Sequence, residues 1–303
     1  FNIVLGATNW MCVMGMNPVQ DGRLCFFIAL IPTVPFFVGT WEEYHTGKLV
    51  LPFFNGPTEG LLLGASLSAI SFVMGVEFWQ GTDFYDLLFG KIFNFLPSAV
   101  EESFKLVLGC TMENTMRNCE IIVMLSVVIL SQEFISKVIF VVRNHGIKSL
   151  RNIIPFLTLA IVGGFVCHNH KEIFQRHTRL CLNLGAALFV DMVAQLMLDH
   201  MTLQPFNPYR LALMPLVLFS FIATGMEETD KDAYVWSYTA SMTVYLSMKM
   251  HVVISEICTC LGIWCFDIET PYRYPTTENT PAEVGNGVLA NGNCSATTKY
   301  QSM

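Results

Sequence analysis

Charged and aromatic side chains interrupt the apolar sequence at one place in the chain. The segment Trp41-Glu42-Glu43-Tyr44-His45-Thr46-Gly47-Lys48 follows an apolar run directly, and Glu59 opens the next run within Asn55-Gly56-Pro57-Thr58-Glu59-Gly60. A carboxylate or an imidazole can deprotonate a hydroxyl group when its pKa is tuned toward the working pH. Carboxylates are unfavourable in hydrocarbon, so their presence beside such apolar sequence requires a reason. Candidate acid–base groups are therefore Glu42, His45 and Glu59, with Trp41, Tyr44 and Asn55 as candidate substrate contacts.

The same residues also have a structural explanation. Acidic side chains at the end of a spanning helix are solvated, and Trp41 and Tyr44 suit the aromatic belt at a membrane–water interface. Glu59 lies two residues after Pro57, where a helix can begin, and the helix dipole favours a glutamate in the first turn. Residue types and spacing alone leave the structural and the functional interpretation open.

Composition places the chain among membrane proteins. Of its 303 residues, 53% are hydrophobic and only 14% are charged, whereas a soluble domain carries about 25% charged residues. The net charge of -7 argues against nucleic acid as a partner, because phosphate backbones attract clusters of Lys and Arg. The 10 cysteines form no Cys-x-x-Cys pair, so they suggest neither a zinc knuckle nor a thioredoxin-like site.

Apolar runs alternate with short polar breaks along the sequence. A spanning helix needs about 20 residues, and this length predicts an all-α polytopic membrane protein with about eight transmembrane helices. They are expected at Phe1–Met16, Leu24–Thr40, Leu61–Phe78, Ile121–Val142, Ile153–Cys167, Leu180–Met201, Leu211–Thr224 and Tyr234–Phe266. The weaker amphipathic stretch Asp83–Val100 is expected to be interfacial or re-entrant. Residues 1–268 then form one membrane domain, and the polar residues 269–303 form a disordered tail.

A few ionisable residues fall inside the apolar runs. Asp191 lies in one such run and Lys249 in another. Charges within a membrane usually face the bundle interior and pair with one another. Pairing of Asp191 with Lys249 is expected, and a structural ion pair explains such residues better than catalysis does.

The charged and aromatic segment Trp41–Lys48, named the border segment from here on, belongs to a stretch that resembles a known family. The run from Phe36 to Gly47, Phe-Phe-Val-Gly-Thr-Trp-Glu-Glu-Tyr-His-Thr-Gly, together with Asn55–Gly60 at this spacing, resembles the eukaryotic choline/ethanolamine phosphotransferases of the CDP-alcohol phosphotransferase family. Weaker similarities are Glu77-Phe78-Trp79-Gln80, His200-Met201-Thr202 and Met250-His251-Val252-Val253-Ile254. The resemblance extends from Phe1 to about Ile268, and its specific part is the block Trp41–Gly60.

The resemblance implies an enzyme of phospholipid synthesis. Such enzymes transfer phosphocholine or phosphoethanolamine from CDP-choline or CDP-ethanolamine to diacylglycerol, releasing CMP, in the membrane of the endoplasmic reticulum or the Golgi. The resemblance also suggests a homodimer, although no face of any predicted span identifies itself as the interface. Carboxylates of the family signature hold Mg²⁺ or Mn²⁺, hard cations that prefer oxygen ligands and neutralise charge at the transferred phosphoryl group.

The family signature, Asp-x-x-Asp-Gly-x-x-Ala-Arg followed by Gly-x-x-x-Asp-x-x-x-Asp, does not occur in this sequence. Asp21-Gly22-Arg23 matches only a small piece of it, and the first residue is Phe1 rather than Met. We therefore expect the chain to be the later part of a longer protein, with the metal ligands just upstream of Phe1 and none within it. Residues 1–303 alone should then be inactive.

Without the metal ligands, the residues of this chain are expected to form the side of the active site that binds the acceptor. Glu59 and His45 would lie near the diacylglycerol hydroxyl, with Glu42 as a second carboxylate, and Trp41 and Tyr44 would line the access from the bilayer. Two other classes stay open, a polytopic transporter, which intramembrane charges would also suit, and a non-catalytic membrane scaffold. The sequence immediately before Phe1 would distinguish all three.

Overall fold

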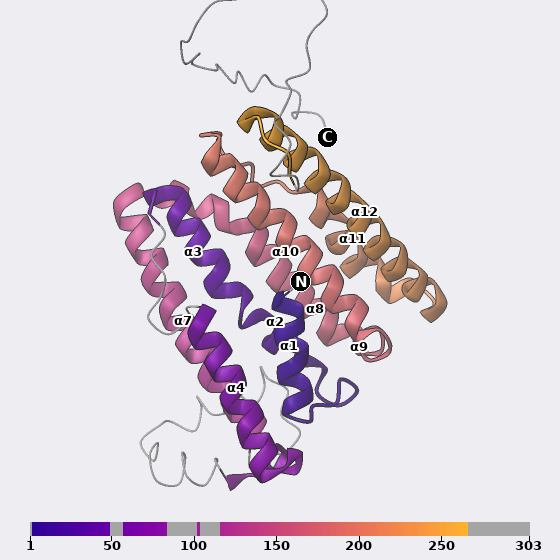
Figure 1. The fold of residues 1–303 in the computed structure, drawn as a ribbon. Coiled ribbons are helices and arrows are strands. Elements are labelled where there is room, and N and C mark those ends of the chain that lie inside the picture. The colour runs from indigo at the N-terminus through magenta and orange to yellow at the C-terminus, as the bar shows by residue number, and fades with distance from the viewer. Residues whose placement is uncertain (1, 49–56, 84–101, 104–115, 266–303) are drawn as a thin grey trace, which may run out of the picture. The chain divides into compact units, whose positions relative to one another are not determined.

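The described part of the chain is entirely helical. The computed structural model describes residues 2–48, 57–83, 102–103 and 116–265, and no strand occurs among them (Figure 1). This confirms the all-α prediction. The α-helices are α1 (Asn2–Val13), α2 (Gly22–Leu30), α3 (Thr33–Thr46), α4 (Pro57–Met74), α7 (Asn118–His145), α8 (Ile154–Asn169), α9 (Lys171–Arg176), α10 (Thr178–Met201), α11 (Met214–Ile222) and α12 (Glu228–Leu261). The 3-10 helices are η1 (Val76–Gln80), η3 (Ile147–Ile153), η4 (Leu211–Leu213) and η5 (Ala223–Gly225).

Several of these helices are long and apolar enough to cross a membrane. Five helical segments of the described residues meet that description: Gly22–Thr46, Asn118–His145, Ile147–Asn169, Thr178–Met201 and Glu228–Leu261. Two shorter apolar helices are Leu62–Met74 and Leu211–Gly225. The polytopic membrane class is therefore confirmed, whereas the count of eight spans stays a prediction. The amphipathic stretch from residue 84 onward and the polar tail 269–303 lie outside the described residues.

A proline break divides the first long span into α2 and α3. Pro32 lies between the two helices and has no backbone N–H to continue the hydrogen-bond ladder. The hydroxyl of Thr33 donates to the carbonyl oxygen of Leu30 over 2.8 Å, which satisfies one group at the break. At the other end, Gly47 adopts a φ of 68° and its N–H donates to the Glu43 carbonyl over 2.8 Å. This left-handed cap ends α3 directly after the charged and aromatic cluster.

The chain divides into two compact units, Phe1–Thr243 and Val244–Met303. In the first unit, α3 packs against both α7 and α10, and α1 packs against α2 and α4 (Figure 1). The second unit contains the C-terminal part of α12. The arrangement of the first unit decides what surrounds the end of α3.

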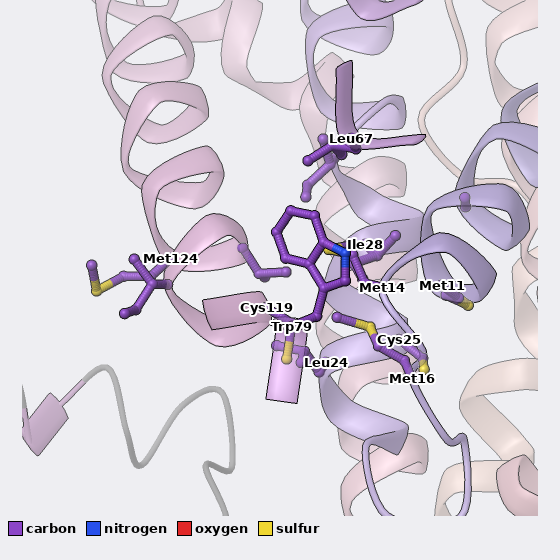
Figure 2. Close-up of a cluster of buried hydrophobic side chains, with 14 of the residues drawn as sticks. Met11, Met14, Met16, Leu24, Cys25, Ile28, Leu67, Trp79, Cys119 and Met124 are labelled. Carbon is purple, nitrogen blue, oxygen red and sulfur yellow. The ribbon is translucent and has the colours of Figure 1, made fainter. Parts of the chain in front are cut away.

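The core around α1, α2 and α7 is rich in methionine and contains a buried indole. Figure 2 shows the ring of Trp79 among Met14, Ile28 and Leu67, all of which are buried. The indole N–H of Trp79 donates to the Ser71 hydroxyl over 2.6 Å, so its polar atom is satisfied as burial requires. Flexible methionine side chains fill the irregular space around this rigid ring, and together they fix η1 against the helices on either side.

Candidate functional site

The aromatic residues of the border segment anchor the end of α3. Trp41 is fully buried, and its indole N–H donates to the Ser149 carbonyl in η3 over 3.2 Å. The hydroxyl of Tyr44 donates to the Gln204 carbonyl over 3.1 Å and accepts from the Phe206 N–H over 2.9 Å. Both side chains therefore fasten α3 to segments that follow α7 and α10. Their predicted role in lining an access for lipid stays a prediction.

Glu42 forms an ion pair with a neighbouring helix. Its carboxylate lies 2.5 Å from the ammonium of Lys137 in α7, and the exposed fractions of the two side chains are only 7% and 11%. The pair joins α3 to α7 within the apolar helical segments Gly22–Thr46 and Asn118–His145, where an unpaired charge would be strongly unfavourable. Glu42 can accept a proton from a substrate only if this pair is disturbed, which makes a structural role the simpler one for it.

His45 lies among other polar and aromatic rings. The amide nitrogen of Asn152 is 3.5 Å from His45 Nε2, a long hydrogen bond. The ring centroid of His45 is 5.8 Å from that of His145 at the end of α7 and 5.1 Å from that of Tyr44. The centroids of Tyr44 and His200, at the end of α10, are 6.1 Å apart. Three imidazoles thus gather where α3, α7 and α10 end, and His45 can exchange a proton without breaking an ion pair.

The remaining predicted site residues are only partly covered by the structure. Glu59 lies in the first turn of α4, as its position after Pro57 predicts, but its side chain is not described. Asn55 lies outside the described residues. Among the residues that are described, no group of three or more His, Cys, Asp or Glu side chains could hold a metal ion. No metal ligand is therefore assigned in this chain.

A buried charged cluster that sequence reasoning did not find lies near the start of α7. The guanidinium of Arg117 lies 2.5 Å from an Asp21 carboxylate oxygen and 2.7 Å from one of Glu120, and it donates to the side-chain oxygen of Gln80 over 2.7 Å. Burial alone would lower the pKa of Arg117, but hydrogen bonds with Asp21 and Glu120 raise it above its usual value. Glu120 also accepts from the Arg117 backbone N–H over 2.8 Å, which closes a capping box. The glutamate three residues after Arg117, ahead of a long apolar run, was the signal available in the sequence.

Asp191 has a cationic partner that the sequence did not predict, and its expected pairing with Lys249 stays a prediction. Asp191 is fully buried in α10, and its carboxylate accepts from the guanidinium of Arg210, with a shortest distance of 2.6 Å. Arg210 lies nine residues after Met201, the last residue of α10. The segment that follows α10 therefore places this cation beside Asp191. Pattern reading considered only charges inside apolar runs and therefore passed over a partner in the adjoining loop.

Comparison with known proteins supports the resemblance carried by the border segment. The chain is 28% identical over 238 residues to an uncharacterized CDP-alcohol phosphatidyltransferase class-I family protein of Schizosaccharomyces pombe, covering 77% of this chain and 58% of that protein. It is 27% identical over 263 residues to choline/ethanolaminephosphotransferase 2 of Arabidopsis thaliana, covering 82% and 64% respectively. The chain is a homologue of the CDP-alcohol phosphotransferases. Cholinephosphotransferase 1 of Saccharomyces cerevisiae is another such relative, 26% identical over 254 residues, covering 78% of this chain and 60% of that protein.

The similarity to the CDP-alcohol phosphotransferases covers more of this chain than of each relative. The chain spans about three fifths of the length of the relatives that it matches. No family model matches the sequence. The apolar helices and the relatives point to an integral membrane protein that is homologous to CDP-alcohol phosphotransferases, whereas the homodimer and the organelle stay predictions.

Proposed function

We propose that this chain forms the acceptor-binding part of an enzyme that transfers phosphocholine or phosphoethanolamine from CDP-choline or CDP-ethanolamine to diacylglycerol. The products are phosphatidylcholine or phosphatidylethanolamine and CMP. The observation that carries this proposal is the similarity over about four fifths of the chain to relatives named for this transfer. That similarity favours a transferase over a transporter.

The chemistry assigned to this chain is proton removal from the acceptor. The hydroxyl oxygen of diacylglycerol forms a bond to the phosphorus next to the choline or ethanolamine, while the bond from that phosphorus to CMP breaks. The hydroxyl proton passes to Glu59 in the first turn of α4, or to His45 in the last turn of α3. A positioned base of this kind contributes about 10²- to 10⁴-fold to the rate.

The end of α3 supplies the rigid frame for that step. Trp41 and Tyr44 fix the last turns of the helix through hydrogen bonds to η3 and to the segment after α10, and Glu42 fixes them through Lys137. His45, which lies on this turn, therefore loses little freedom when it meets the hydroxyl. Bound Mg²⁺ or Mn²⁺ would supply charge neutralisation at the phosphoryl group, and the described residues of this chain are not assigned to hold it.

A chimera tests the proposal. Residues 1–303 are placed behind a segment that carries the Asp-x-x-Asp-Gly-x-x-Ala-Arg signature and are expressed in yeast membranes devoid of this activity. Radiolabelled CDP-choline or CDP-ethanolamine is then supplied with diacylglycerol and Mg²⁺, and the label that enters phospholipid is counted. We expect transfer that requires diacylglycerol and survives Glu43→Gln, which alters a carboxylate beside the site. A folded chimera that transfers neither group would instead support a non-catalytic scaffold.

A further inference from the structure

Two cysteine thiols lie in contact at the end of α12, within the second unit. Cys258 belongs to the last turn of the helix, and Cys265 lies four positions after its final residue, Leu261. The two side chains interact through a hydrogen bond, and both are free thiols. A bond between the two sulfur atoms would therefore close the short loop 258–265.

A glycine cap turns the chain back toward Cys258. Gly262 has a φ of 64°, in the left-handed region that glycine adopts readily. The Ile263 N–H donates to the Cys258 carbonyl over 3.0 Å, and the Gly262 N–H donates to the Thr259 carbonyl over 3.4 Å. These are the two hydrogen bonds of a Schellman motif at a helix end. The cap therefore holds the chain in the direction that brings Cys265 beside Cys258.

Both thiols are accessible. Cys265 is exposed and Cys258 is half-buried, whereas Cys25 and Cys119 lie buried in the core of the first unit. The 34 residues of α12 extend over about 51 Å, and the hydrocarbon core of a bilayer is only about 30 Å thick. A helix of this length extends beyond the hydrocarbon when it crosses once. The exposed Glu256 favours a polar surrounding for its last turns.

We propose that Cys258 and Cys265 form a reversible disulfide bond by exchange with a low-molecular-weight disulfide, and that this bond fixes the turn that ends α12. The reacting group in such an exchange is a thiolate. A pair of thiols already in contact loses little freedom when it reacts, so the second step of the exchange follows the first readily.

The exchange has two steps. The more exposed thiolate, that of Cys265, attacks the small disulfide, which forms a mixed disulfide and releases one small thiolate. The thiolate of Cys258 then attacks the Cys265 sulfur, the bond between the two cysteines forms, and the second small thiolate leaves. Two protons pass from the protein thiols to the small thiolates. The two cysteines are oxidised, and one small disulfide is reduced to two thiols.

This site is independent of phosphotransfer. It lies in the second unit, whereas the border segment and its partners lie in the first. The site uses none of the residues assigned to the acceptor. Failure of the transfer assay would therefore leave the inference intact.

Redox titration of the full chain tests the inference. The reduced protein in detergent is equilibrated with mixtures of oxidised and reduced glutathione, and the remaining thiols are trapped with N-ethylmaleimide. Cleavage after Lys249 and Arg273 yields the fragment 250–273, which contains Cys258, Cys260 and Cys265. We expect a fragment that has lost two hydrogens and carries one maleimide, on Cys260. A fragment that keeps all three thiols, or that carries glutathione on separate cysteines, would overturn the proposal.

Serine variants establish which thiols pair. Cys258→Ser and Cys265→Ser should each abolish the disulfide. Cys260→Ser is the matched control and should leave it intact, because two positions on a helix are about 200° apart around the axis, so that Cys260 and Cys258 lie on different sides. Loss of the disulfide in Cys260→Ser would assign the bond to another pair and refute the inference.

The role of the cap is tested by Gly262→Ala. A left-handed φ is unfavourable for alanine, so the equilibrium constant for oxidation should fall roughly 10-fold. An unchanged constant would contradict a cap that brings the thiols together. Hydrogen exchange tests what the bond does: the amides of Gly262 and Ile263 should exchange at least about 10-fold more slowly in the oxidised protein, because the bond restricts the opened state. Equal exchange in both forms would overturn the role assigned to the bond.

Discussion

Removal of the Lys137 ammonium should destabilise the protein strongly, because it leaves the Glu42 carboxylate buried without its cation. Exposed ion pairs contribute about 0–1 kcal/mol, whereas loss of one partner from a buried pair costs about 3–5 kcal/mol. Exposed fractions of 7% and 11% place this pair in the second class. For a chain of this size the loss corresponds to a fall of roughly 6–20 °C in melting temperature.

The assay compares four proteins in the same detergent by thermal denaturation: the unaltered chain, Lys137→Met, Glu42→Met and the double variant. Replacement of both partners by apolar residues of similar volume is often neutral or stabilising, so the double variant should melt close to the unaltered chain. Two results would refute the reasoning. One is a single variant that melts within about 2 °C of the unaltered protein, and the other is a double variant as unstable as either single one.

The double variant also decides what Glu42 does. In the transfer chimera, a double variant that melts normally and retains its rate would assign Glu42 to structure alone. A double variant that is stable but has lost at least about 100-fold in turnover would restore the carboxylate to the chemistry, since that is the contribution expected of an acid–base group.

Further outcomes are expected from the same preparations. Residues 1–303 alone should incorporate no label from CDP-choline, because the sequence holds no metal-binding signature; measurable transfer would contradict this. In the chimera, Glu59→Gln should lower turnover at least about 100-fold, and full turnover would remove Glu59 from the mechanism. Arg117→Met should destabilise the chain by about 3–5 kcal/mol, since two carboxylates lose their cation, and an unchanged melting temperature would argue against the buried cluster. Because the pKa of His170 is lowered by burial and by Lys231, the unfolded state binds more protons there; stability should fall as the pH drops below about 6.5. His170→Leu should flatten that part of the stability–pH profile, and an unchanged slope would assign it to other groups.

The sequence predicted the helices better than it predicted their partners. Apolar length identified the long spans, because about 20 residues are needed whatever the neighbours are. Pro57 predicted where α4 begins. The same reasoning missed the proline break after α2, where Pro32 lies inside a continuous apolar run. Apolar length does not distinguish one spanning helix from two consecutive ones.

The candidate site was predicted in part. The border segment was found because charged residues beside apolar sequence are conspicuous. The ion pair of Glu42 with Lys137 was not predicted, because a cation 95 positions away gives no local signal in the sequence. Ser149 and Asn152 were missed for the same reason, since ordinary polar residues, here in η3, become part of the site only through the fold. Pairing of Asp191 with Arg210 shows that partners of intramembrane charges must also be sought in loops.

The long sequence interval between Glu42 and Lys137 has a consequence for biogenesis. Synthesis at about 5–20 residues per second separates their emergence from the ribosome by roughly 5–20 s. During this time, the span Gly22–Thr46 carries an uncompensated carboxylate near its end, and α7 has not been made. The span must then wait at the lipid boundary or beside the insertion machinery until α7 arrives. The final placement of the end of α3 in the bilayer thus depends on α7, a helix that is made later.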